Sequence, residues 1–417
     1  MNLKELYQLY SKNYRIDTNT RNIRKDSLFF ALKGERFNGN HFAKQALEKG
    51  AAYCVIDEKE FEIPGATILV EDVLNTLQKL ARYHRRELGI PIIGITGSNG
   101  KTTTKELINA VLQTQFKTSA TEGNLNNHIG VPLTLLSFSP DIEIGIVEMG
   151  ANHQKEIEFL CSICEPDIGY ITNFGKAHLE GFGGIEGVIK GKSELYAYLR
   201  QHQKTVLVNT RDPKQIELTT GIERFELSNS VIKASEQPFL EVVYQNQHIC
   251  TKLIGAYNLA NINAAISMGD YFQISLENII AGIENYAPSN NRSQLIKKKS
   301  NALLMDAYNA NPSSTKLALQ NFNTIEHHKK VVILGDMFEL GESSIKEHQN
   351  IVDFCENLEL YRLIFVGKHY AQTTAKESYT NLPALIKELT SHPLEDCFVL
   401  IKGSRGMALE KLVPLIP

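Results

Sequence analysis

The chain has 417 residues, more than one ordinary hydrophobic core accommodates, and this length indicates two to four domains. Hydrophobic residues make up 42% and charged residues 22%, the balance of a globular protein, and the net charge of -3 gives no electrostatic reason to expect a nucleic-acid partner. No apolar run approaches the roughly 18 residues that span a bilayer, and residues 1–6 lack the apolar core of a signal peptide. We therefore expect a cytoplasmic protein that inserts into no membrane and binds no nucleic acid.

Six cysteines are too few for a disulfide scaffold in a chain of this length, which fits a reducing compartment. Cys161 and Cys164 form a CxxC pair, but the sequence offers no second pair and no His-x-His cluster to complete a metal site. Two thiols on the buried face of a helix are the better interpretation, with metal ligation as the alternative.

The first 86 residues predict a small mixed α/β domain. Two β-rich segments flank a short helix that Gly50 ends, and a basic helix then leads through Gly89 and Pro91 into a new apolar strand. Glycine and proline at this point are typical of a domain boundary. The predicted strands are 27–32 and 51–56, and the predicted helices are 42–49 and 77–88.

Beyond Pro91, strands alternate with helices, which predicts parallel α/β sheets. A hairpin is expected over 241–251, turning at Gln245–Asn246, and the turn-rich segment 286–291 marks a second boundary. We therefore predict an α/β protein of three domains: 1–86, 87–289 with a mostly parallel sheet of the phosphate-loop type, and 290–417 with a Rossmann-like fold. The remaining predicted strands are 92–95, 142–147, 168–171, 205–208, 302–305, 331–334, 363–366 and 398–401.

The segment 96–102, with the sequence TGSNGKT, predicts a phosphate-binding loop between a strand and a helix. A glycine-bearing turn at this place leaves backbone amides free and directs a helix amino terminus at an anion. Lys101 would add a charge at the β- and γ-phosphates of ATP, and the hydroxyl of Thr102 would bind Mg²⁺. The general pattern has a glycine where Ile95 stands, so the loop fits a shorter variant.

A magnesium ion also needs a carboxylate. Glu148 follows an apolar strand directly, and the carboxyl end of a strand lies at the ligand-binding edge of an open α/β sheet. A buried structural glutamate is the alternative interpretation of this residue.

Three stretches together resemble the Mur ligases: TGSNGKTT over 96–103, EGNLNNHIGVPLT over 122–134 and EMG over 148–150. The resemblance extends over most of the chain and implies ATP and Mg²⁺ as cofactors. Residues 17–39 are similar to the uridine-nucleotide domain of that family, although Asn19 stands where the family often has aspartate.

Two further segments resemble places where the family binds metal. His178 lies in NFGKAHLEGFGG, residues 173–184, which is similar to the stretch that holds a second-metal histidine. KGKSELY, residues 190–196, is similar to the segment with a carbamylated lysine; Lys192 is the candidate and Lys190 the alternative. A carbamate would supply an anionic oxygen, which suits Mg²⁺. The implied metal ligands are Thr102, Glu148, His178 and, if carbamylated, Lys192.

The resemblance implies a nucleotide site whose residues come from both the second and the third predicted domain. GAYNLAN, residues 255–261, resembles the adenine-side motif with Tyr257 in place of the usual histidine, and DAYNANP, residues 306–312, resembles a motif of the ATP cleft. Arg292 matches the arginine that the third domain brings to the phosphates. The implied ATP-binding residues are Gly97, Ser98, Asn99, Gly100, Lys101, Thr102, Thr103, Asn258, Asn261, Arg292, Asp306, Asn309 and Asn311.

The segment LGDMFELG, residues 334–341, followed by His348, resembles the branch of the family that adds D-alanyl-D-alanine, and the D-N-P-R signature of the diaminopimelate-adding branch is absent from the third domain. KGSRG, residues 402–406, follows the last apolar strand and favours a substrate role. The implied substrate-binding residues are Asn19, Arg21, Lys33, Gly34, Asn126, Asn127, Asp336, Glu339, Lys402, Ser404 and Arg405.

The resemblance implies an ATP-dependent ligase, expected to be a monomer, that joins UDP-N-acetylmuramoyl tripeptide to D-alanyl-D-alanine through an acyl phosphate. A carboxylate that attacks a polyphosphate meets like-charge repulsion, so cationic groups should carry the catalysis. The implied catalytic residues are Lys101, His178, Lys192 and Arg292. Two alternatives remain: a Mur-type or folate polyglutamate ligase with other substrates, and a regulator that binds ATP without joining substrates.

Overall fold

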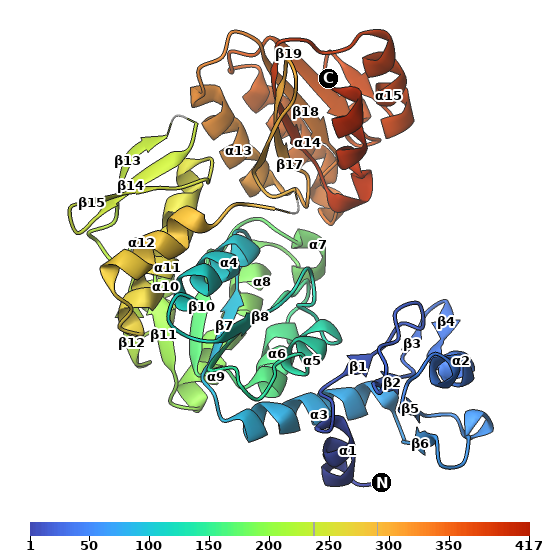
Figure 1. Cartoon of the computed structure of the whole chain (residues 1–417). Helices are drawn as coiled ribbons and strands as arrows, with labels where there is room; N and C mark the ends of the chain where they lie inside the picture. Colours follow the sequence, from blue (N-terminus) through green and yellow to red (C-terminus); the bar gives the residue numbers. More distant parts are fainter. Residues whose placement is uncertain (237, 290) are drawn as a thin grey trace.

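The computed structural model describes residues 1–236, 238–289 and 291–417, which form three α/β blocks along the molecule (Figure 1). The amino-terminal block lies at one end, the carboxyl-terminal block lies at the other, and the phosphate loop belongs to the block between them. No helix among the described residues combines the length and apolar character that crossing a membrane requires. Three domains and the α/β class agree with the sequence-based prediction. The borders at 86/87 and 289/290 stay a prediction, and Asn290 lies outside the described residues.

The amino-terminal domain is built on a parallel sheet with the strand order β1-β2-β5-β6. Apolar side chains on one face of this sheet, such as Phe30 and Val55, share a buried cluster with the central domain. The elements are α1 (Leu3–Tyr10), β1 (Ile16–Asp17), β2 (Leu28–Phe30), β3 (Lys33–Gly34), β4 (Phe37–Asn38), η1 (Gly39–Phe42), α2 (Ala43–Glu48), β5 (Tyr53–Ile56), η2 (Lys59–Phe61) and β6 (Thr67–Leu69).

Helix α3 (Val73–Leu88) connects the first two domains and is held at its carboxyl end by a buried arginine. Asp72 caps the helix, accepting the amide of Asn75 at 2.6 Å, and Gly89 ends it with φ of 63°. Arg85 donates to the carbonyl of Cys164 at 3.0 Å and pairs with Asp167 at 2.6 Å. The helix therefore joins both domains through packing and through hydrogen bonds.

The central sheet is entirely parallel, with the strand order β12-β11-β10-β7-β9-β8. The connection after β7 leads to β8, and the connection after β9 leads in the opposite direction to β10, so a ligand crevice is expected beyond the carboxyl ends of β7 and β9. The elements are β7 (Ile92–Thr96), α4 (Lys101–Leu112), β8 (Thr118–Ala120), α5 (Gly130–Leu135), β9 (Ile144–Glu148), α6 (Glu156–Cys164), β10 (Ile168–Ile171), α7 (Leu179–Phe182), α8 (Ile185–Lys192), α9 (Glu194–Gln201), β11 (Thr205–Val208), α10 (Pro213–Leu218) and β12 (Arg224–Glu226).

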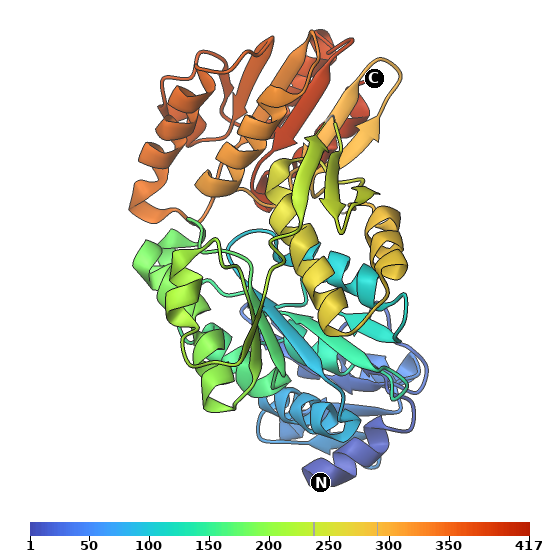
Figure 2. The same cartoon turned by 90° about the vertical axis from the view of Figure 1, so that its left-hand side faces the viewer.

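A small antiparallel sheet and two helices complete the central domain and adjoin the carboxyl-terminal domain (Figure 2). Helices α11 and α12 cover the face of the central sheet that α4 also covers, in one buried apolar cluster. The elements are β13 (Ile232–Glu236), β14 (Leu240–Tyr244), β15 (Gln247–Cys250), η3 (Ala256–Asn258), α11 (Leu259–Tyr271) and α12 (Leu276–Asn285).

The carboxyl-terminal sheet has the strand order β16-β17-β21-β18-β19-β20, parallel except for β16. Separate apolar clusters lie on its two faces. The elements are β16 (Gln294–Lys297), β17 (Ala302–Asp306), α13 (Pro312–Thr324), β18 (Lys330–Gly335), η4 (Gly341–Ser343), α14 (Ser344–Cys355), β19 (Arg362–Val366), η5 (Tyr370–Gln372), β20 (Ser378–Tyr379), α15 (Leu382–Ser391), β21 (Phe398–Lys402), η6 (Arg405–Met407) and η7 (Leu409–Leu415).

Most predicted elements are present, with shifted ends. The strands 168–171 and 205–208 are confirmed as β10 and β11, and the hairpin turns at Gln245–Asn246 as predicted. The strand predicted over 142–147 begins only at Ile144; the amide of residue 142 donates to the carbonyl of Ser139, and that of residue 143 to the carbonyl of Lys117, just before β8. Cys161 and Cys164 are buried thiols on α6, each near the sulfur of Met149, as the core interpretation predicts.

We predict that Arg85→Ala lowers the free energy of unfolding by about 2 kcal/mol or more. The substitution leaves buried carbonyl groups without their hydrogen-bond donor and removes one of the two cations that pair with Asp167. Arg86→Ala is the matched control, since the Arg86 side chain is 63% exposed and its pair with Glu165 should contribute less than about 1 kcal/mol. Urea denaturation followed by far-ultraviolet circular dichroism measures both variants. Equal losses would contradict the assignment of Arg85 as the buried anchor.

Candidate functional site

The turn after β7 is held by residues that follow the neighbouring strand β10. Gly97 has φ of 139°, and a Cβ there would lie 2.0 Å from Oγ1 of Thr172, so only glycine fits. The amides of Ser98 and Asn99 donate to the backbone and side-chain oxygens of Asn173, each at 3.1 Å. These contacts fix the turn so that the start of α4 faces the crevice.

The first turn of α4 presents free amides and one ammonium group. Helical bonding begins where the amide of Thr104 donates to the carbonyl of Gly100 at 2.8 Å, so the three preceding amides have no partner of their own within the helix. Nζ of Lys101 donates to the carbonyl of Gly97 at 2.7 Å and thus lies folded over the loop. Burial lowers the pKa of Lys101 despite the nearby carboxylate of Glu148. An anion bound in the loop would offset this cost, so the geometry suits a polyphosphate.

Thr102 and Glu148 meet beside the loop, as a magnesium site requires. The hydroxyl of Thr102 donates to Oε2 of buried Glu148 at 2.8 Å, and Nδ2 of Asn126 donates to Oε1 at 2.7 Å. Among the described residues, no three His, Cys, Asp or Glu side chains form a metal cluster. One carboxylate and one hydroxyl nevertheless fit Mg²⁺, because this ion usually takes its other ligands from water and substrate phosphates.

The two candidate lysines on α8 lie in opposite environments. Lys190 is exposed, whereas Lys192 is buried, with Nζ donating to the carbonyl of Ala151 at 2.9 Å and lying 5.0 Å from the ring centroid of Phe182. Burial holds the pKa of Lys192 well below its ordinary value, and the charge of Lys101 adds to this shift. Lys192 does not itself line the cavity, but it contacts the lining residue Ala151, whereas the exposed Lys190 does not line the cavity.

Asn258 and Asn261 line the site, but the protein already uses part of their hydrogen-bonding capacity. Nδ2 of Asn261 donates to Oδ1 of Asn258 at 2.8 Å, and Oδ1 of Asn261 accepts from the hydroxyl of Thr104 at 3.0 Å. Nδ2 of Asn258 donates to the carbonyl of Ile254. These amides therefore brace the phosphate-loop helix, and each keeps only the rest of its capacity for a base edge.

The carboxyl-terminal domain supplies the opposite wall. The guanidinium carbon of Arg292 lies 3.5 Å from the ring centroid of Tyr308, so the cation stacks on the ring. Nζ of Lys402 pairs with Asp306 at 2.6 Å and also donates to the carbonyl of residue 309.

One side-chain contact crosses directly from this wall to the phosphate loop. Asn311 caps α13 and donates from Nδ2 to Oδ1 of Asn99 at 2.7 Å. The loop conformation is therefore supported by two domains.

These residues enclose a cavity of about 690 Å³ between the central and carboxyl-terminal domains. The sequence missed Asn173, Tyr257 and Tyr308 as site residues, although all three lie inside the quoted motifs and could have been found there. The predicted residues that line the cavity are Ser98, Asn99, Gly100, Lys101, Thr102, Thr103, Asn126, Asn127, Glu148, His178, Asn258, Asn261, Arg292, Asp306, Asn309, Asn311 and Lys402.

Some predicted substrate contacts in the carboxyl-terminal domain do not line this cavity. Asp336 is buried and accepts the amides of His369 and Tyr370, each at 3.0 Å, so the carboxylate organises a loop and is not available to a substrate. Ser404 is likewise buried, and its hydroxyl accepts the amide of Phe338 at 2.9 Å.

Two other predicted contacts have partners within the protein. The carboxylate of Glu339 pairs with Nδ1 of His178, which the sequence-based assignment to the substrate did not foresee. Arg405 is exposed, with its guanidinium carbon 5.3 Å from the ring centroid of Tyr308.

The four predicted uridine-site residues lie in the amino-terminal domain, outside the cavity. Asn19 and Arg21 are exposed, and Oδ1 of Asn19 accepts the amide of Arg21 at 3.0 Å. Lys33, next to Gly34 on β3, pairs with Asp57 at 2.9 Å and with Glu58 at 2.7 Å. Lys33 and its two acidic partners thus form a cluster of mixed charge in the amino-terminal domain.

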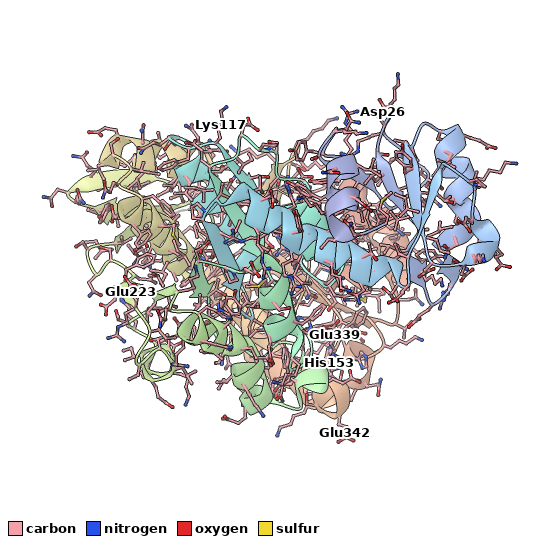
Figure 3. All side chains as sticks on the ribbon, turned by 90° about the horizontal axis from the view of Figure 1, so that it is seen from below. Asp26, Lys117, His153, Glu223, Glu339 and Glu342 are labelled. Atoms are coloured by element: carbon pink, nitrogen blue, oxygen red, sulfur yellow. The ribbon has the colours of Figure 1, made fainter. Side chains whose placement is uncertain are left out.

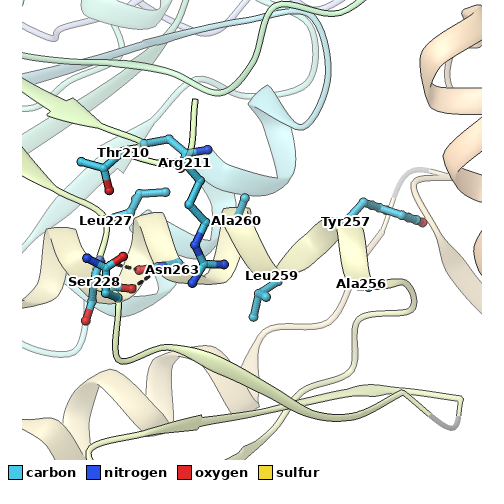
Figure 4. Close-up of a pocket in the computed structure, with 11 residues that line it drawn as sticks. Thr210, Arg211, Leu227, Ser228, Ala256, Tyr257, Leu259, Ala260 and Asn263 are labelled. Atoms are coloured by element: carbon cyan, nitrogen blue, oxygen red, sulfur yellow. Dashed lines mark hydrogen bonds between the residues drawn. The ribbon is translucent and has the colours of Figure 1, made fainter. Parts of the chain in front are cut away.

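A second, smaller cavity of about 210 Å³ lies beside α11 (Figure 4). The side chain of Arg211 reaches along this helix, while Asn263 bonds both the amide and the carbonyl of Ser228. This smaller cavity shares Tyr257 with the cavity at the phosphate loop, and its other lining residues lie outside that site.

Three protein-family models match successive parts of the chain. The Mur ligase middle domain matches residues 95–269, the glutamate ligase domain of Mur ligases matches 291–405, and the catalytic domain of the Mur ligase family matches 13–87.

Similar proteins and structures cover nearly the whole chain. The UDP-N-acetylmuramoyl-tripeptide–D-alanyl-D-alanine ligases of Bacillus subtilis and Escherichia coli are 34% and 32% identical to it, each over 95% of this chain and 92% of the relative. A crystal structure of MurF from Acinetobacter baumannii is 30% identical, with a TM-score of 0.83 over 96% of this chain and 92% of that chain. MurF from Thermotoga maritima in complex with ADP is 26% identical, with a TM-score of 0.83 over 96% of both chains. The chain belongs to the Mur ligase family.

Proposed function

We propose that this chain is the ATP-dependent ligase that adds D-alanyl-D-alanine to UDP-N-acetylmuramoyl tripeptide in peptidoglycan synthesis, acting as a cytoplasmic monomer. The observation that carries the proposal is the cavity with Lys101, Thr102 and Glu148 on one wall and Arg292 on the other. The names of the relatives, similar over nearly their full length, supply the two substrates.

The first step is phosphoryl transfer. The terminal carboxylate of the tripeptide attacks the γ-phosphorus of ATP, the bond to the bridging oxygen of ADP breaks, and an acyl phosphate forms. Lys101 and the free amides of α4 hold the phosphates, and Arg292 faces them from the other domain. Mg²⁺, held by Thr102 and Glu148, would neutralise further charge on the phosphates.

The second step is acyl transfer. The amine of D-alanyl-D-alanine attacks the acyl carbon, inorganic phosphate leaves, and the nitrogen loses a proton. Positioning by two domains and exclusion of water from the acyl phosphate should account for most of the rate, because no nucleophilic side chain is needed. We assign the uridine nucleotide to residues 1–86, ATP to 87–289, and the dipeptide to 290–417, with Lys402 and Arg405 as its cationic contacts.

We predict that phosphate release requires both substrates together. The physical reason is that the acyl phosphate forms only on a bound carboxylate and is consumed only by a bound amine. Release is measured with ATP and each substrate singly, then with both. Release that is indifferent to the substrates would support an ATP-dependent regulator, and stimulation by an amino acid other than the dipeptide would support another Mur-type ligase.

Arg292→Ala should lower kcat by about 100-fold or more while changing ATP affinity much less, because the guanidinium stabilises charge that develops during transfer. Steady-state kinetics and equilibrium binding of ATP separate the two effects. Lys299→Ala, an exposed charge on the same segment, is the control for the loss of net charge. Equal losses in binding and turnover would contradict this role.

Lys192 should carry a carbamate, formed when its neutral amine adds to carbon dioxide and releases one proton. The lowered pKa makes the neutral amine that reacts with carbon dioxide more accessible than in an exposed lysine, and the carbamate should disappear as the solution is acidified. Carbon-13 nuclear magnetic resonance with labelled bicarbonate detects it. Lys192→Met should abolish the signal and lower turnover by about 10-fold or more, whereas Lys190→Met should keep both. A full-activity Lys192→Met variant would exclude the carbamate.

A further inference from the structure

One hydrogen bond joins a cavity residue of the central domain to a loop of the carboxyl-terminal domain. Nδ1 of His178, at the start of α7, pairs with Oε2 of Glu339, in the loop between β18 and η4. His178 lines the cavity, whereas Glu339 does not. Figure 3 shows Glu339 where the carboxyl-terminal domain meets the green segment that contains α7, and Glu342 at the outer edge.

The chemistry of this pair fixes the place of the imidazole proton. An ionised carboxylate can only accept a hydrogen bond, so the contact with Oε2 of Glu339 places a proton on Nδ1 of His178. In the neutral ring, Nε2 then keeps its lone pair. In the parts of the chain that the structure describes, Nε2 has no hydrogen-bond partner. A free lone pair on a cavity-lining ring is what ligation of a divalent cation requires.

A backbone hydrogen bond supports the pair across the same junction. His178 and Glu339 adopt φ of 53° and 60°, and the amide of Glu180, on α7, donates to the carbonyl of Glu339 at 3.4 Å. On the far side, the amide of Met337 donates to Nε2 of buried His348 at 3.0 Å. The carboxylate of Glu339 thus contacts His178 from a loop that is anchored in the carboxyl-terminal domain.

We propose that Glu339 is a positioning residue that fixes the tautomer and direction of His178, so that this histidine binds a divalent cation only when the carboxyl-terminal domain is docked. The inference rests on the proposed function, because it assigns His178 to the ATP-bound cation. It replaces the substrate contact that the sequence predicted for Glu339. A metal-bound histidine typically donates its other ring N–H to a carboxylate, and loss of such a partner weakens metal binding.

A neighbouring ion pair provides the matched control. Nζ of Lys176 pairs with Oε1 of Glu347 at 2.8 Å, so Glu347→Ala removes another carboxylate between the same two domains without touching His178. Glu342→Ala is a second control, because it removes an exposed carboxylate at the outer edge of the molecule, away from the contact between the two domains.

The first experiment reads the tautomer in the absence of any metal. Nitrogen-15 resonances of histidine-labelled full-length protein, assigned with His178→Gln, distinguish protonation at Nδ1 from protonation at Nε2. The wild type, Glu347→Ala and Glu342→Ala should show His178 protonated at Nδ1, and Glu339→Ala should lose this preference. An unchanged His178 tautomer in Glu339→Ala would overturn the proposal.

The second experiment uses Mn²⁺ as the probe, with ADP present. Electron spin-echo spectroscopy should detect imidazole nitrogen coupled to bound Mn²⁺ in the wild type, and Glu339→Ala should lose this coupling and bind that ion about 10-fold to 100-fold more weakly. An equal loss in Glu347→Ala would mean that Glu339 only holds the domains together, and would overturn the proposal. Absence of ligase activity in a wild type that passes both tests would reject the proposed function and not this inference.

Discussion

The parallel register of β7, β9 and β10 is the constraint from which the rest of the site follows. Parallel strands end at one edge, so the phosphate loop, Glu148 and the residues around Asn173 are brought together, although Glu148 and Asn173 lie 46 and 71 residues beyond Thr102 (148 − 102 and 173 − 102). This edge must leave amides of α4 without protein partners. Such amides are stable only in contact with water or an anion, and the second domain that closes over the edge allows the anion to replace the water.

The inner strands of the sheets could be predicted from the sequence, whereas most edge strands could not. Strands such as β7, β9, β18 and β21 are buried at every residue and are therefore recognisable as continuous apolar runs. The missed strands all lie at sheet edges and have two to five residues; they are β1, β3, β4, β6, β8, β12, β13, β16 and β20. Their identity as strands comes from pairing with a neighbouring strand, and local periodicity over so few residues does not reveal it.

The site shows the same division between local and long-range information. Residues whose role is set by an adjacent strand or helix end, such as Lys101, Thr102 and Glu148, could be placed from the sequence. The roles of Asp336 and Glu339 could not, because one carboxylate faces amides that follow β19 and the other faces a histidine about 160 residues away. A motif shows which residues belong together, but the direction in which each side chain points depends on packing between domains.

The hydrogen bond from Asn311 to Asn99 has a consequence for protein engineering. Because the donor belongs to the carboxyl-terminal domain and the acceptor to the phosphate loop, neither domain is self-sufficient in the part that holds the nucleotide. A chimera that exchanged the carboxyl-terminal domain for that of a relative with different substrates would need an amide or other donor at the residue that caps its first helix. Compatibility of two domains in such a hybrid would thus depend on one side chain as well as on the fit of their surfaces.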